Sequence, residues 1–186
     1  MFDTYHTERL ILKTLSQDAA SMVLSFYEDN KEYFEPWEPQ RSKSFYTMSY
    51  QKASLSAESV QMSEGKLLRL WVFLKDNPYE IIGTLCFQNL LKDPYCSCSL
   101  GYKFSHRHLH CGYATESLRK GLEIIFQDYR MHRVEAFILP NNLPSLQLID
   151  RMDFDFEGIS YSFARIGGEW VDHMRYSVIN PKDIRK

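Results

Sequence analysis

The stretch at residues 105–116, SHRHLHCGYATE, contains side chains that two kinds of chemistry could use. His106, His108 and His110 alternate, so an extended backbone would place them on one face, and imidazole nitrogens bind zinc, copper or nickel. The same stretch ends in a glycine at the start of a helical pattern. Main-chain N–H groups at a helix start lack partners within the helix and attract anions such as phosphate. The sequence therefore offers either a metal site or a phosphate-binding loop.

The residues around this stretch favour the phosphate interpretation. The histidines stand where a strand gives way to a helix, so an extended backbone is not expected, and no nearby carboxylate would orient their rings. Gly112 has no Cβ and lets a diphosphate approach the chain closely. Ala114 is small, and Thr115 could add a hydroxyl group. We therefore expect no metal ligands here and an anion site at residues 112–115, with a plain helix start as the alternative.

The elements that must position this loop follow from hydrophobic periodicity and turn residues. They alternate between helical and extended patterns, and the segment at residues 28–46 reads as a loop or broken helix. Strands are expected at residues 8–15, 67–75, 79–91, 95–104 and 132–139 and on both sides of Gly167-Gly168, and helices after Ser16, at about 47–62, from 112 and at 142–152. This order predicts an α+β fold with a mixed sheet. A helix crossing between residues 95–104 and 132–139 makes that pair parallel.

Length and composition suit one globular domain spanning residues 1–186. Hydrophobic residues make up 44% of the chain and charged residues 25%, with a net charge of −2. No overall basic field indicates a direct nucleic-acid partner. No apolar run suggests a membrane segment or signal peptide, so we expect a cytoplasmic location and four free thiols. The cysteines are Cys86, Cys96, Cys98 and Cys111.

Several short motifs, in order along nearly the whole chain, carry a family resemblance. Residues 109–114 resemble the acyl-CoA pyrophosphate motif Q/R-x-x-G-x-G/A of the GNAT superfamily of N-acetyltransferases. The chain is similar in particular to the ribosomal-protein-alanine N-acetyltransferase group, through TERLIL at 7–12, LGY at 100–102, GYATE at 112–116, NLPS at 142–145, FDFEG at 154–158 and WVDH at 170–173. This resemblance implies the GNAT fold: a mixed central sheet of about seven strands with a splayed parallel pair, flanked by about four helices.

The resemblance also implies acetyl-CoA as cosubstrate, without a metal, and assigns residues that would bind it. The main chain of Tyr102, Lys103 and Phe104 would pair with the pantetheine arm. The pyrophosphate would lie on Leu109, His110, Cys111, Gly112, Tyr113, Ala114 and Thr115. Asn142 would contact pantetheine, unless it serves only as a helix N-cap.

The same resemblance indicates catalytic and acceptor residues. Ser145 would donate a proton or hydrogen bond to the departing thiolate, although a serine in a first helical turn also bonds backbone. Glu157 is the first candidate for the general base, with a structural role as its alternative, and Glu35 and Glu38 are the second candidates. Glu35, Trp37 and Glu38 would line the acceptor site.

Three departures from the group's pattern bear on binding and catalysis. Leu109 replaces the usual Gln or Arg, and His110-Cys111 replaces Gly-Lys, so a basic side chain is lost from the loop. Ser99 stands where many relatives carry a glutamate. Asp153 occupies a place where a helix-ending glycine is common.

The implied reaction is acetyl transfer from acetyl-CoA to a primary amine. The first candidate acceptor is the N-terminal α-amine of a ribosomal or other protein. An antibiotic, polyamine or amino acid is the alternative acceptor, and a non-catalytic acyl-CoA sensor is the alternative function. Both a monomer and a homodimer are compatible with the sequence.

Overall fold

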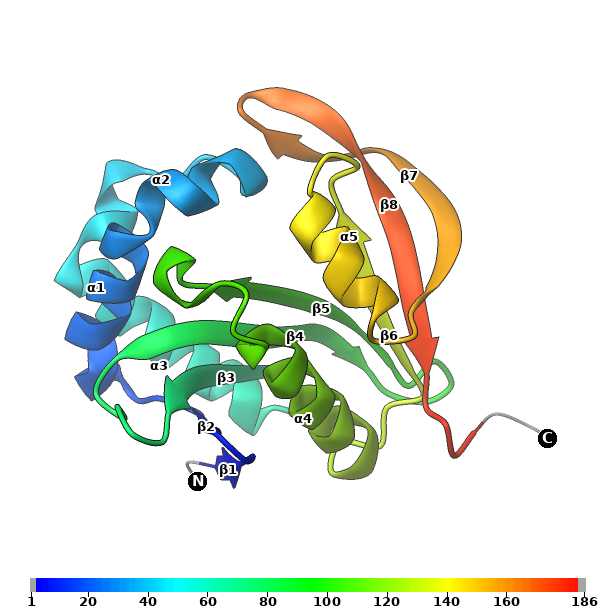
Figure 1. Cartoon of the computed structure of the whole chain (residues 1–186), viewed down its shortest axis with the longest axis horizontal. Helices are drawn as coiled ribbons and strands as arrows, with labels where there is room; N and C mark the ends of the chain where they lie inside the picture. The colour runs from blue at the N-terminus through cyan, green and yellow to red at the C-terminus, as the bar shows by residue number, and fades with distance from the viewer. Residues whose placement is uncertain (1–2, 184–186) are drawn as a thin grey trace.

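A computed structural model describes residues 3–183 and shows one mixed sheet of eight strands (Figure 1). The strands lie in the order β1-β2-β3-β4-β5-β6-β8-β7, and only β5 and β6, among the described strands, pair in parallel. Their bounds are β1 Thr4–His6, β2 Leu10–Lys13, β3 Leu67–Leu74, β4 Ile81–Leu91, β5 Ser97–Phe104, β6 Arg133–Ile138, β7 Asp155–Ile166 and β8 Glu169–Ile179. The expected mixed α+β fold is confirmed.

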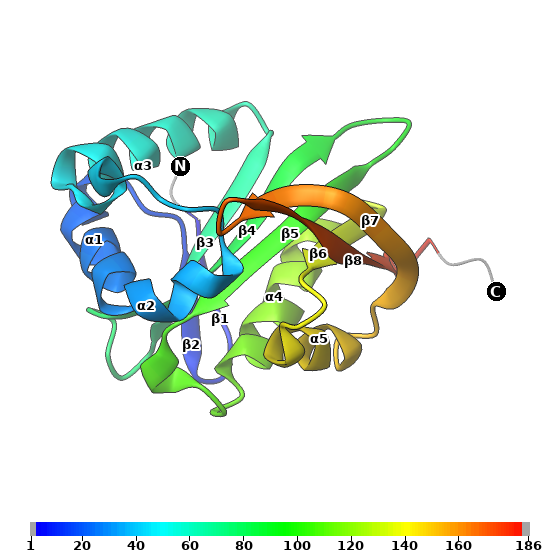
Figure 2. The ribbon, with the colours of Figure 1, turned by 90° about the horizontal axis from the view of Figure 1, so that it is seen from above.

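Helices cover both faces of this sheet. They are α1 Ala20–Asp29, α2 Lys31–Phe34, α3 Met48–Ser63, α4 Tyr113–Gln127 and α5 Leu143–Asp150. Viewed from above, α1 to α3 lie on one side of the sheet and α4 and α5 on the other (Figure 2). Of the described helices, none is both long and apolar enough to cross a membrane.

The two faces bury separate hydrophobic clusters, as the alternation within β3 predicts. Leu70 and Val72 belong to the cluster beneath α4 and α5. Trp71 and Phe73 belong to the cluster beneath α1 and α3. Successive side chains of a strand point to opposite faces of the sheet, so the position of a residue in its strand decides which face its side chain occupies.

The parallel pair separates partway along its length. Only three residue pairs join β5 to β6, and the last of them is Ser99 with Glu135. Beyond that pair, residues 100–104 of β5 and 136–138 of β6 continue without each other. We call this opening the fork. It is the splayed pair that the family resemblance implied.

Two short elements go beyond the expected count of strands and helices. The three-residue strand β1 pairs with β2, and α2 occupies four residues of the segment expected to be loop or broken helix. Two turns of 3-10 helix, η2 Glu35–Trp37 and η3 Lys43–Tyr46, lie in the same segment, and residues 38–42 connect them without regular structure. Asp153 adopts φ 57°, so the turn after α5 accommodates an aspartate in a left-handed conformation.

Candidate active site

The chain turns sharply just before α4 and leaves the first amides of that helix uncapped. Gly112 is the N-cap residue, with φ 78° and ψ −1°, and no side chain caps the helix. His110 is also left-handed, with φ 60°. The uncapped amides and the positive end of the helix dipole together favour an anion at this position.

Two residues of the turn between β1 and β2 hold this loop in place. Arg9 donates from Nη1 to the carbonyl oxygen of Cys111 at 3.0 Å and from Nε to Glu116 at 2.7 Å. The Thr7 hydroxyl donates to the same carboxylate at 2.6 Å. Burial would raise the pKa of Glu116, but the bonds from Thr7 and Arg9 hold it below its ordinary value. Arg9 was not among the predicted site residues, although it belongs to the TERLIL motif at residues 7–12.

The histidines do not form the extended row that a metal site would need. His106 and His108 lie in the 3-10 turn η4, His106–His108, and Nδ1 of His106 lies 2.8 Å from Oδ1 of Asn30. Arg107 pairs with Asp29 at 3.5 Å. Across residues 3–183, no three His, Cys, Asp or Glu side chains are grouped so that they could hold a metal ion.

On the α4–α5 face, one hydrogen bond joins the fork to the start of α5, and a second one caps that helix. The Tyr102 hydroxyl donates to the carbonyl oxygen of Ser145 at 3.2 Å. The amide of Ser145 donates to Oδ1 of Asn142 at 3.3 Å, so Asn142 is the N-cap of this helix. Burial raises the pKa of Tyr102, which keeps its hydroxyl protonated as a donor. The structure thus brings these three predicted residues together at the fork.

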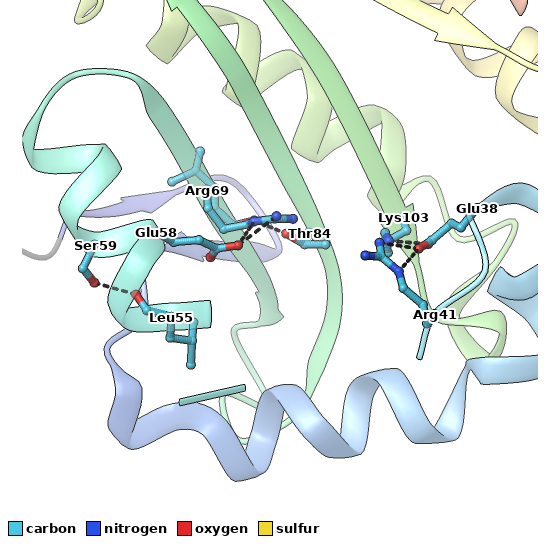
Figure 3. A network of polar contacts seen from close by, with 9 residues as sticks. Glu38, Arg41, Leu55, Glu58, Ser59, Arg69, Thr84 and Lys103 are labelled. Carbon is cyan, nitrogen blue, oxygen red and sulfur yellow. Dashed lines mark hydrogen bonds and ion pairs between the residues drawn. The ribbon is translucent and has the colours of Figure 1, made fainter. Parts of the chain in front are cut away.

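On the opposite face, an ion pair attaches the segment at residues 28–46, which we call the aromatic segment, to β5. Glu38 pairs with Lys103 on β5 and with Nη2 of Arg41 at 2.9 Å (Figure 3). Burial would raise the pKa of Glu38, but both cations hold it below its ordinary value. Trp37 is half-buried at the end of η2, whereas Glu35 is exposed and lies 3.7 Å from Lys31. Of the three predicted acceptor residues, Glu38 is the one bound to the fork strand.

Glu157 lies in a four-residue charged network on this same face. It pairs with Arg133, lies 3.5 Å from Nε of Arg175, and accepts a 2.8 Å bond from the hydroxyl of Ser177. Arg133 and Arg175 also pair with Glu135, the last residue of β6 joined to β5. The bond from Arg133 is the main reason that the pKa of Glu157 lies below its ordinary value.

Ser145 and Glu157 therefore stand on opposite faces of the sheet. Motif comparison did not identify Arg133, Glu135 or Arg175. The alternation of buried residues along β6 could have placed Arg133 and Glu135 on one face, but their partners come from other strands.

Comparison with known proteins agrees with this geometry. A family model for the acetyltransferase (GNAT) domain matches residues 9–155. The [ribosomal protein uS5]-alanine N-acetyltransferase of Escherichia coli is 27% identical over 94% of this chain and 90% of the relative.

Solved structures show the same fold. The ribosomal-protein-S5-alanine acetyltransferase of Vibrio fischeri superposes with a TM-score of 0.91 at 23% identity, covering 99% of this chain and 100% of that one. Mycobacterium smegmatis RimJ, solved with CoA-disulfide, gives a TM-score of 0.87 at 23% identity over 95% of this chain and 85% of that one. With an uncapped helix start beside a forked parallel pair, this chain belongs to the GNAT acetyltransferase family and is an N-acetyltransferase that uses acetyl-CoA.

Proposed function

We propose that the acceptor is the N-terminal α-amine of a protein, with a ribosomal protein as the first candidate. The observation that carries this proposal is the fork, which has a serine on one face and a charged network on the other. The similarity to the E. coli uS5-alanine enzyme over 94% of this chain supports the choice of acceptor.

Acetyl-CoA would lie along the fork with its diphosphate at the start of α4. The amides from His110 to Ala114, with the Thr115 hydroxyl, would hold the diphosphate, since no side chain occupies that position as a cap. Lys103 is engaged by Glu38 and the Phe104 side chain is buried. These two side chains are therefore not available to pantetheine. The main chain at these positions has no partner in β6 and would pair with pantetheine.

The two faces of the fork suit the two proton transfers. The amine nitrogen attacks the thioester carbon, and a main-chain amide of β5 stabilises the oxyanion. The intermediate then collapses, the C–S bond breaks, and the Ser145 hydroxyl gives its proton to the thiolate and recovers one from solvent. The proton lost by the attacking amine passes through water to Glu157. Attack and departure then occur on opposite sides of the sheet.

Replacing Glu157 by Gln should lower kcat/KM about tenfold or more on the alkaline plateau, because the proton released by the attacking amine loses its acceptor. The pKa of Glu157 is already below its ordinary value, so this group is ionised throughout the neutral range. The wild-type rate should therefore rise with pH through the acceptor's α-amine pKa of about 8. The pH profile of the variant should keep that midpoint but reach a lower plateau of kcat/KM.

The control for this variant is Glu169→Gln, because Glu169 is an exposed residue beside the β7–β8 turn. Its pH profile should overlay the wild-type profile. An unchanged plateau in Glu157→Gln, with acetyl-CoA affinity intact, would remove Glu157 from the reaction.

The acceptor class is tested by intact-mass spectrometry of purified ribosomal proteins incubated with the enzyme and acetyl-CoA. We expect one protein to gain a single acetyl group on its N-terminal residue, located by fragmentation. Acetylation of polyamines or aminoglycosides with every protein left unmodified would instead establish a small-molecule acceptor. If the protein binds acetyl-CoA but releases no free thiol with any amine tested, it would be a sensor.

A further inference from the structure

The face of β5 that is turned away from α4 and α5 is open at Gly101. Ser99, Gly101 and Lys103 alternate with residues that face α4 and α5, so they lie on the same face as the charged network. Gly101 is exposed, and a Cβ built there would meet nothing within 4 Å. An acceptor over the fork therefore has free space above this position. Across the sheet, Gly101 is in register with Cys86 on β4, which is in register with Arg69 on β3.

A small polar cavity lies at Arg69, between α1, α3 and β3. Its volume is about 80 Å³, and its lining includes Tyr27, Arg41, Glu58, Arg69 and Trp71. A buried water needs only about 10–15 Å³ on the same measure, so the cavity admits a group of several heavy atoms.

A buried donor in the cavity wall lacks an acceptor. The Trp71 side chain is 2% exposed, and among residues 3–183 its indole Nε1–H has no hydrogen-bond partner. Buried N–H groups are nearly always bonded, so an unpaired one indicates a missing acceptor. The ring of Tyr27 stands edge-on to Trp71, with centroids 6.1 Å apart, and Nζ of Lys103 lies 5.4 Å from the centre of the same ring.

The charges around the cavity leave one positive charge unbalanced. Arg69 pairs with Glu58 at 2.9 Å, and these side chains are 18% and 16% exposed. Arg41 and Lys103 share the single carboxylate of Glu38. Figure 3 shows the two ion-pair groups, one around Arg69 on β3 and the other around Lys103 on β5. The residues that line the cavity include two cations, Arg41 and Arg69, and one carboxylate, Glu58, which favours an anionic group that also accepts a hydrogen bond.

We propose that this cavity binds a carboxylate of the amine acceptor and thereby selects acceptors with an acidic side chain near the reacting amine. This inference rests on the proposed function, because it places the amine at the fork. Arg69 lies two strands from β5, a distance of about 10 Å at the usual strand spacing. An extended peptide covers that distance in about three residues, so the acidic residue should be among the first four.

The first test observes the Trp71 indole directly. The chain has three tryptophans, so a 15N-labelled sample with bound CoA gives three indole N–H signals, and Trp71→Phe identifies one of them. If that variant does not fold, Trp37→Phe and Trp170→Phe identify the Trp71 signal by elimination. Titration with hexapeptides that begin with alanine and carry aspartate at position two, three or four should shift the Trp71 signal. The matching asparagine peptides should shift it far less.

The second test measures acetyl transfer to the same peptides. At one of the three positions, aspartate should give a kcat/KM about tenfold above asparagine, as expected for one added charge-assisted hydrogen bond. The double variant Arg69→Gln/Glu58→Gln removes both charges and retains polar side chains, and it should bring that ratio close to one. The control is Lys66→Gln/Glu64→Gln, an exposed pair at 2.7 Å whose loss should leave the ratio unchanged.

The outcomes separate this inference from the proposed function. Transfer to all peptides without preference for aspartate, together with a stationary Trp71 signal, would mean that the cavity holds only water, and would overturn the inference alone. A shifted Trp71 signal without transfer to any peptide would support the carboxylate site and contradict the proposed acceptor. A stationary signal overturns the inference whether or not transfer occurs.

Discussion

Replacing Gly112 by Asp should weaken acetyl-CoA binding about 100-fold or more, the largest loss that we expect from a single substitution. Gly112 has φ 78°, a conformation that aspartate and asparagine adopt more readily than other side chains. A Cβ there would lie 3.3 Å from Nη2 of Arg9, a flexible contact that can give way. The fold should therefore survive, while a carboxylate stands beside the amides that hold the diphosphate. Titration calorimetry with acetyl-CoA measures the loss.

Two matched variants separate charge from shape in this experiment. Gly112→Asn has nearly the same shape without the charge and should weaken binding by about tenfold or less. Gly65→Asp places the same charge at another glycine with positive φ (67°), after α3, and should bind acetyl-CoA normally. If Gly112→Asp binds as tightly as Gly112→Asn, the diphosphate does not lie at this helix start.

Replacing Ser145 by Ala should lower kcat about 100-fold while leaving the Kd for acetyl-CoA nearly unchanged, as expected for the loss of a general acid. The substitution isolates the hydroxyl, because the other polar contacts of Ser145 are made by its main chain. Its amide is bonded to Asn142 and its carbonyl to Tyr102, and both bonds remain in the alanine variant. Single-turnover measurement of thiol release, beside calorimetry, distinguishes the chemical step from binding.

Ser49→Ala is the control for this variant, since Ser49 lies in the first turn of α3 and is exposed. It should retain wild-type kcat. A Ser145→Ala enzyme with normal turnover would show that the thiolate leaves without help from this hydroxyl.

Most of the fold could be predicted from the sequence because its signals are local. Strand β3 alternates between two buried clusters, and α4 repeats its buried residues with helical period, so each pattern specifies its element and faces. The crossover through α4 then requires β5 and β6 to be parallel. Strand β1 was missed because three residues are too short to show a period.

The charged contacts of the site could not be predicted in the same way, because they depend on register between distant strands. Glu38 and Lys103 are 65 positions apart and meet only when the aromatic segment folds against β5. Glu157 on β7 and Arg133 on β6 belong to the two strands that flank β8, and their side chains meet across β8. A bulge at residues 156–158 shifts the register of β7 at this point. The sequence analysis named Glu38 and Glu157, but their partners required the three-dimensional structure.

The most direct test of the central claim is a crystal structure of the protein with acetyl-CoA. The account predicts the diphosphate on the main-chain amides of residues 110–114, within hydrogen-bond distance, and the thioester in the fork beyond Ser99. The sulfur should lie on the Ser145 side of the sheet. A diphosphate bound away from the start of α4, or a thioester outside the fork, would contradict the account.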